Sequence, residues 1–103
     1  MYESEFAERL IALREQKGVS AREMSLAIGQ NQNYINRIEN KKNFPSIQVF
    51  FYICEYLNIT PKEFFDFEVK SPNKINKLIP QIEKLSPPQL DALSAVVAEF
   101  NKK

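Results

Sequence analysis

Residues 18–40 of the chain read GVSAREMSLAIGQNQNYINRIEN, and their local signals indicate two helices joined by a turn. Ser20 and Glu23 stand three positions apart, which is the spacing of a capping box at a helix N-terminus. A short helix is therefore predicted over Ala21–Ile28. Gly29 ends it, because glycine readily adopts the left-handed conformation found just beyond helix C-termini. The chain then turns into a second helix.

The second helix is predicted over Gln32–Asn40, with Asn31 as its N-cap. Seven of the fourteen side chains from Gln30 to Asn43 are carboxamides. Asparagine forms helices less readily than lysine or glutamate. A helix that needed only solubility would carry those charged residues instead, so the amides indicate a further role.

This helix has two distinct sides when its residues are placed 100° apart. Ile35 and Ile38 fall on one side, where they can pack on the preceding helix. The other side spans roughly 140° and carries Gln32, Asn33, Asn36, Arg37 and Asn40. A carboxamide matches the N6/N7 edge of adenine, and arginine matches the O6/N7 edge of guanine. The alternative is an ordinary polar helix surface with asparagines near its ends.

Further helices are predicted on either side of this pair. Apolar residues at helical spacing predict helices over Glu3–Gln16 and Ile47–Leu57. Thr60 followed by Pro61 starts a short fifth helix, because proline suits the first helical position. The chain has 103 residues and only two glycines. We therefore expect an all-α fold.

The C-terminal third is predicted to be a helical hairpin that follows a linker at Glu68–Pro72. Apolar residues again recur at helical spacing, and Pro80 is expected to kink or divide the first helix. Ser86 and the two prolines after it mark the start of the last helix. We therefore expect one domain over residues 1–68 and a helical hairpin over residues 69–103.

Composition excludes several classes of function. The chain has no histidine, which excludes imidazole catalysis and the common zinc sites. It also has no glycine-rich phosphate loop. We therefore expect no enzyme activity, no cofactor and no metal. Net charge is +1, so binding to nucleic acid would depend on where basic groups are placed.

The sequence also indicates where the protein works. Its single cysteine, Cys54, cannot form an intramolecular disulfide and has apolar neighbours typical of a core thiol. The longest apolar stretch, Val49–Cys54, is too short to span a membrane. The first residues lack the features of a signal peptide. We expect a cytoplasmic protein with no membrane association.

At this point the sequence resembles the Cro/repressor-type helix-turn-helix family, also called XRE. The resemblance runs from Leu13 to Phe65, and its most specific segment is RIENKKNFPS at residues 37–46. It implies a five-helix, lambda-repressor-like domain that binds double-stranded DNA with its third helix in the major groove. The implied function is sequence-specific regulation of transcription, and we expect repression.

The resemblance also implies roles for individual residues, carried over by position. The expected base readers are Gln32, Asn33, Asn36 and Arg37. The expected phosphate contacts are Arg22, Asn31, Asn40, Lys41, Lys42 and Asn43. Arg14 and Glu39 resemble a family salt bridge that ties the first helix to the end of the third. The alternative for this pair is two unrelated surface charges.

Three positions depart from the family pattern. Ala21 stands where the family often has a phosphate-contacting glutamine, so we expect Arg22 to replace that contact. Ser25 stands where a small alanine is common, which is a mild change. Lys41 stands where glycine is common, and a positive φ costs lysine roughly 1 kcal/mol. We therefore expect Asn40 to adopt that conformation instead.

The helix over Ile47–Leu57 has more apolar surface than a single core-facing side needs. Val49, Phe51, Tyr52 and Tyr56 are expected to point away from the core, either as isolated exposed side chains or as a contact surface. The hairpin can fold back on its own chain or pair with a second copy. We expect some of both, in a C2 homodimer. The expected contact residues are Phe51, Tyr52, Tyr56, Leu90, Leu93, Val97 and Phe100.

A second class of function stays open. A protein-interaction adaptor or an antitoxin could use the same fold and bind a protein partner. The near-neutral charge and the aromatic residues of the Ile47–Leu57 helix favour this class. The amides and the arginine on the polar side of the preceding helix favour DNA binding instead.

Overall fold

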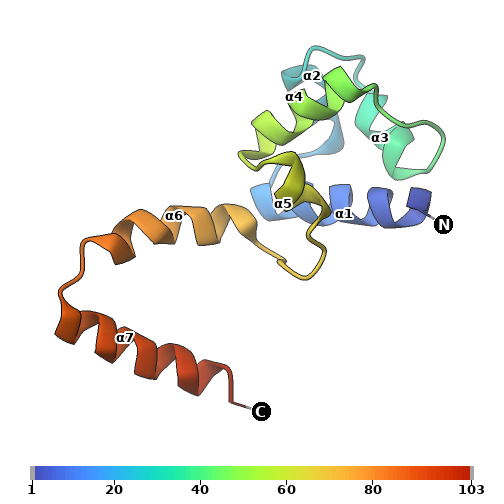
Figure 1. The fold of residues 1–103 in the computed structure, drawn as a ribbon. Helices are drawn as coiled ribbons and strands as arrows, with labels where there is room; N and C mark the ends of the chain where they lie inside the picture. The colour runs from blue at the N-terminus through green and yellow to red at the C-terminus, as the bar shows by residue number, and fades with distance from the viewer. Residues whose placement is uncertain (1, 103) are drawn as a thin grey trace. The chain divides into compact units, whose positions relative to one another are not determined.

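The computed structural model describes residues 2–102, and these residues form helices and loops without any strand. The all-α prediction is confirmed. The chain divides into two units, one ending at Asn73 and the other beginning at Lys74. Each unit is described by itself below (Figure 1).

The first unit contains five helices, which follow the capping signals of the sequence. They are α1 (Tyr2–Lys17), α2 (Ala21–Ala27), α3 (Tyr34–Glu39), α4 (Ile47–Leu57) and α5 (Pro61–Phe65). Ser20 and Thr60 each form a complete capping box, at the starts of α2 and α5. The Ser46 hydroxyl accepts a hydrogen bond from the Val49 N–H at the start of α4. Local side-chain chemistry therefore sets the start of these three helices.

All five helices contribute to one core. Each of them places a fully buried side chain there, and these are Leu10, Met24, Ile35, Ile53 and Phe64. Burying a side chain of this size stabilises the folded state by about 1.5–3 kcal/mol. Cys54 is buried as expected, and this burial raises the pKa of its thiol to about 11. The thiol is therefore protonated at neutral pH.

The orientation of α4 differs from the prediction at three residues. Val49 and Tyr56 pack against the core instead of pointing away from it. Helical spacing also predicts Ile47 on the inner side, with Phe50 and Leu57, yet 68% of its surface is exposed. The core lies against only part of the length of α4, so Ile47 in the first turn extends beyond it. Helical spacing alone does not show where the neighbouring helices end.

A buried arginine joins α1 to α5. Arg9 is only 7% exposed, and its Nε donates to the Phe64 carbonyl at 2.7 Å. Its Nη2 donates to the carbonyls of Glu63 at 2.7 Å and Asp66 at 3.0 Å. These carbonyls lie at the C-terminal end of α5, where the helix dipole favours a cation. Burial lowers the pKa of the Arg9 guanidinium, and the charge of Asp66 opposes that shift.

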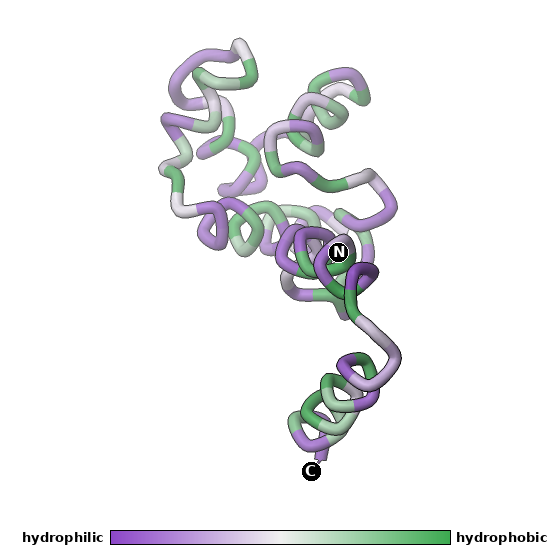
Figure 2. The backbone as a smooth tube through the Cα atoms, turned by 90° about the vertical axis from the view of Figure 1, so that its left-hand side faces the viewer, coloured by the Kyte–Doolittle hydropathy of each residue, from purple (hydrophilic) through white to green (hydrophobic). Residues whose placement is uncertain are grey.

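The second unit consists of most of α6 (Pro72–Glu83) and all of α7 (Pro87–Phe100). Ser86 and Gln89 form a complete capping box at the start of α7, as the sequence predicts. The α6 helix continues through Pro80, so the proline does not divide it. Hydrophobic and hydrophilic stretches alternate along α7 in Figure 2.

The apolar side chains of the second unit are not covered. Among the described residues 74–102, no side chain is buried. The exposed apolar residues there are Ile75, Leu78, Ile79, Leu90, Val96, Val97 and Phe100. Within residues 2–102, no helix combines the length and the apolar character needed to cross a bilayer.

Candidate nucleic-acid interface

The end of α2 forms a tight glycine turn that leads toward α3. Gly29 has a φ of +78°. Its N–H donates to the Leu26 carbonyl at 3.1 Å, and the Gln30 N–H donates to the Ser25 carbonyl at 2.9 Å. This pair of bonds is a Schellman motif, which needs a left-handed residue at the position of Gly29. The sequence therefore sets the direction in which the chain leaves α2.

Ser25 then ties the turn to α3. It is fully buried, and its Oγ donates to the Ala21 carbonyl at 2.7 Å. The same oxygen accepts a hydrogen bond from the Ile35 N–H at 3.0 Å. An alanine could make neither bond, so this substitution is more than the mild change expected from the sequence. Sequence reasoning missed the role because the two partners belong to different helices.

The start of α3 corrects two predictions. The helix begins at Tyr34 instead of Gln32, and its N-cap is Asn33 instead of Asn31. The Asn31 Oδ1 accepts a hydrogen bond from the Asn33 N–H at 2.8 Å. Asparagine side chains favour such turns because they bond the backbone two residues ahead. Asn31 therefore closes the turn before the helix, and Gln32 lies in that turn.

The polar side chains of α3 and its preceding turn remain accessible. Ile35 and Ile38 are buried in the core. The four expected base readers are all exposed, and these are Gln32, Asn33, Asn36 and Arg37. Two hydrogen bonds order part of this side. Arg37 Nε donates to Asn43 Oδ1 at 3.3 Å, and Asn40 Nδ2 donates to Asn36 Oδ1 at 3.1 Å.

The end of α3 corrects a further prediction. Lys41, not Asn40, has the left-handed backbone, with φ of +63° against −92°. The Lys41 N–H donates to the Ile38 carbonyl and the Lys42 N–H to the Arg37 carbonyl, each at 2.9 Å. This is again a Schellman motif. Because Asn40 is the C-cap, the left-handed position falls on the residue after it, whatever its side chain.

The expected phosphate contacts lie at the two ends of this region. Arg22 is exposed on α2. The others flank α3, with Asn31 before it and a run of four residues after it. That run is Asn40, Lys41, Lys42 and Asn43, of which the first three are exposed and Asn43 is half-buried. Two lysine charges therefore lie next to the exposed amides.

The structure brings Arg14 and Glu39 together. Arg14 Nε lies 2.7 Å from Glu39 Oε2, and Arg14 Nη2 donates to Glu39 Oε1 at 3.1 Å. The Nη1 of Arg14 donates to the Val19 carbonyl at 2.9 Å. The hydrogen bond with Glu39 raises the pKa of Arg14. Two parallel bonds fix both side chains, so the pair orients α3 against α1.

The expected dimer contacts lie on α4 and α7. Phe51 and Tyr52 are exposed on α4, and the Tyr52 hydroxyl accepts a hydrogen bond from Gln48 Nε2 at 2.9 Å. Tyr56 is partly buried, and its ring centroid lies 4.8 Å from the Lys17 ammonium nitrogen. The four expected residues of α7 carry accessible surface, with Leu90, Val97 and Phe100 exposed and Leu93 half-buried.

Comparison with known proteins locates the similarity in the first unit. The model of the helix-turn-helix domain family matches residues 7–68. One similar solved structure is that of the restriction-modification controller protein C.AhdI from Aeromonas hydrophila, with a TM-score of 0.57 and 27% sequence identity. The similarity covers 61% of this chain and 91% of C.AhdI. No curated protein matches the chain.

Proposed function

Because this chain belongs to the helix-turn-helix domain family, in its Cro/repressor-type (XRE) form, and is a DNA-binding regulator of transcription, we propose that α3 enters the major groove of DNA. The supporting observation is the accessible row of amides and arginine on α3 and the turn before it. Ile35 and Ile38 anchor the opposite side in the core. The helix can therefore present its polar side without exposing apolar surface.

The proposed readout follows from the chemistry of these side chains. Gln32 lies in the turn before α3 and Asn33 is the N-cap of the helix. Both therefore stand beside the end from which recognition helices usually contact base edges. Their amides suit adenine, and the Arg37 guanidinium suits guanine. Asn36 is a fourth candidate reader. None of these side chains carries a negative charge that would repel phosphate.

The proposed phosphate contacts hold this helix in register. Lys41 and Lys42 supply positive charge at the C-terminal end of α3. Arg22 is proposed to supply it from α2, while Asn31, Asn40 and Asn43 would donate hydrogen bonds. Such contacts fix orientation but carry little sequence information.

We propose that the protein binds as a homodimer and represses transcription. Its net charge of +1 provides little nonspecific attraction to DNA, so a single copy would bind weakly. Two recognition helices about 34–36 Å apart, or a multiple of this, would span a palindromic site. A dimer on such a site within a promoter would exclude the polymerase.

One experiment tests the site and the residue roles together. Sequences bound by the full chain are selected from a random DNA pool, and variants are then titrated on the selected site and on random DNA. We expect Gln32→Ala to cost about 1–3 kcal/mol on the selected site and to relax one base position. Lys42→Ala should weaken both DNAs alike and lower the salt slope by about one. Identical behaviour of the two variants on both DNAs would show that these roles are wrong.

A second candidate function is supported by one observation. Phe44, Phe65 and Phe67 are exposed on the first unit, and exposed aromatic surface is typical of protein interfaces. An interaction adaptor of this fold would bind a protein through it and would not need DNA. Retardation of DNA at two salt concentrations separates the two functions, because DNA binders lose affinity steeply as salt rises. Absence of any DNA binding at low salt would favour the adaptor.

A further inference from the structure

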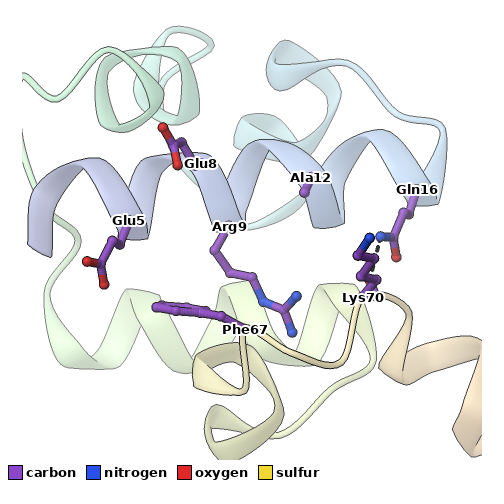
Figure 3. Close-up of a pocket in the computed structure, with 7 residues that line it drawn as sticks. All are labelled: Glu5, Glu8, Arg9, Ala12, Gln16, Phe67 and Lys70. Atoms are coloured by element: carbon purple, nitrogen blue, oxygen red, sulfur yellow. Dashed lines mark hydrogen bonds between the residues drawn. The ribbon is translucent and has the colours of Figure 1, made fainter.

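Two charged or polar side chains are buried among residues 2–102, and both connect helices. They are Arg9 and Ser25. Arg9, drawn in Figure 3, donates to carbonyls at the C-terminal end of α5 and in the loop after it. Ser25 belongs to α2 and accepts a hydrogen bond from α3, the helix proposed to read DNA. The bond made by Ser25 therefore bears on DNA recognition.

Most helices of this chain are capped by their own N-cap side chain. The first N–H groups of a helix have no partner within it, and an N-cap oxygen commonly accepts one of them. Ser20, Ser46, Thr60 and Ser86 do this for α2, α4, α5 and α7. Each hydroxyl accepts from the N–H of the third residue of its helix. These four side chains are thereby engaged by their own helices.

The α3 helix is built differently. Its N-cap, Asn33, makes no side-chain hydrogen bond to the helix, although asparagine is among the best capping residues. Asn33 has a ψ of 2°, whereas the four capping residues have ψ between 160° and 164°. Capping side chains reach their helix from such an extended backbone. The Asn33 side chain is therefore not placed to cap α3, and it is exposed.

The N–H groups at the start of α3 find partners outside the helix. Those of Asn33 and Tyr34 donate to the side-chain oxygen and the carbonyl of Asn31, at 2.8 Å and 3.0 Å. The Ile35 N–H donates to Ser25 Oγ at 3.0 Å. Ile35 is the second residue of α3, and an N-cap side chain usually bonds the second or third N–H. Ser25 therefore makes a bond that the N-cap residue usually makes.

The surroundings of Ser25 commit it to this bond. Its side chain is 0% exposed, so water does not compete for the hydroxyl. The hydroxyl proton is donated to the Ala21 carbonyl at 2.7 Å, which leaves the oxygen to accept from Ile35. Without this oxygen the buried Ile35 N–H would lose its acceptor, which is costly. The first turn of α3 would then shift or recruit the N-cap side chain.

We propose, on the basis of the DNA-binding function proposed above, that Ser25 is a positioning residue for base reading. By capping α3 from α2, it leaves the Asn33 amide free to contact a base edge. An amide that capped α3 would have its oxygen on the helix backbone and could not present the donor–acceptor pair that matches adenine. Ser25 thus controls the base pair read by Asn33, while Arg37 reads another base pair independently of it.

A double-mutant cycle in the full chain tests this role. The native chain, Ser25→Ala, Asn33→Ala and the double variant are titrated on a site selected from random DNA and on versions with each base pair replaced. Asn33→Ala should weaken binding to the selected site about tenfold and flatten the preference at one base pair. Ser25→Ala should flatten the same preference and keep the one that Arg37→Ala removes. In the Ser25→Ala background, Asn33→Ala should cost less than about threefold.

Thr60→Ala is the matched control for a lost capping hydroxyl. The Thr60 hydroxyl accepts from the Glu63 N–H at the start of α5, a helix that the proposal does not place on DNA. This variant should be less stable than the native chain and keep every base preference. Circular dichroism checks that all variants are folded at the temperature of the titrations.

Thermal unfolding tests the release of Asn33 without any change at Ser25. Replacing a capping residue by alanine usually costs enough stability to lower the unfolding midpoint by several degrees. We expect such a loss for Thr60→Ala, and a shift of less than about 1 °C for Asn33→Ala. Equal losses would show that Asn33 caps α3, and the inference would fail.

Hydrogen exchange in the free protein tests the bond itself. Ser25→Ala should accelerate exchange of the Ile35 N–H at least about tenfold more than that of the Ile53 N–H in α4. Ile53 serves as the reference because a general loss of stability affects both groups. Equal acceleration at the two positions would show that Ser25 does not protect Ile35.

The titrations can also overturn the inference. If Ser25→Ala weakens all DNAs alike and keeps every base preference, its role is only structural. If the effects of Ser25→Ala and Asn33→Ala are independent, Ser25 does not act through Asn33. If Asn33→Ala changes no preference, Asn33 reads no base, although readout by Arg37 stands. If the native chain binds no DNA even at low salt, the proposed function fails as well.

Discussion

The two units of the chain have equally clear local signals but differ in what their helices bury. The α2 helix begins with a complete capping box at Ser20, and α7 begins with one at Ser86. Met24 on α2 is nevertheless fully buried, whereas Val97 on α7 is 47% exposed. Caps and helical spacing determine where helices form. Isolated helices of this length are marginal in water, so burial decides whether they are stable.

The difference suggests different sources of stability for the two units. The first unit has a core to which all five helices contribute, closed by the buried Arg9. The second unit is short, and chains below about 40 residues usually need a partner or a cross-link to fold. Its order should therefore depend on contact with other surfaces. Three pairs of substitutions test this comparison.

The largest effect is expected from replacing a fully buried phenylalanine, compared with the same replacement at an exposed phenylalanine. Phe64 is 0% and Phe100 82% exposed. In the full chain, at concentrations where it is monomeric, Phe64→Ala should lower the free energy of unfolding of the first unit by about 3–5 kcal/mol. Phe100→Ala should change it by less than about 0.5 kcal/mol. Urea denaturation followed by circular dichroism measures both, and equal losses would contradict the comparison.

A smaller loss is expected when the contact of Arg9 with α5 is removed. Arg9→Met keeps an apolar stem but takes a charged donor from the carbonyls of Glu63, Phe64 and Asp66. We expect the free energy of unfolding to fall by about 2–3 kcal/mol. Arg22→Met, at an exposed position, is the matched control and should stay within about 0.5 kcal/mol. If both variants unfold at the same urea concentration, the buried arginine is not what holds α5 on α1.

The smallest effect is expected at the end of α3, and it has the opposite sign. Lys41→Gly should raise the free energy of unfolding by up to about 1 kcal/mol, because glycine adopts a φ of +63° without strain. Lys42→Gly should lower it, since Lys42 is not among the positive-φ positions found in residues 2–102. Thermal denaturation compares the two. Both variants should bind DNA more weakly if each lysine contacts phosphate, with salt slopes reduced by about one.

Much of the fold could be predicted because its signals are local. The bounds of α4 are those predicted, since Ser46 starts the helix and the apolar run defines its length. The family resemblance noted from the sequence is confirmed by the match over residues 7–68. The start of α3 was wrong by two residues because Asn31 can cap a helix or close a turn, and both uses look alike in sequence.

The exposed amides of the candidate site could be predicted from the sequence. The contacts that hold α3 in place could be predicted less well. The two-sided pattern of α3 places Ile35 and Ile38 inside, which the structure confirms. Ser25 supports α3 through a hydrogen bond to Ile35, and no local pattern indicates that bond. Tyr56 packs against the core, although its position on α4 suggested an outward direction.

The helices, the glycine turn after α2 and the polar side of α3 follow from local sequence signals. Capping, helical spacing and the conformational freedom of glycine act within a few residues, so they can be read from neighbouring positions. Only the packing of distant segments shows that Ser25 holds α3 and that Arg9 is buried. Arg9 and the Phe64 carbonyl are 55 positions apart. Burial and long-range hydrogen bonds depend on which distant segments meet, and that is set only when the whole unit packs.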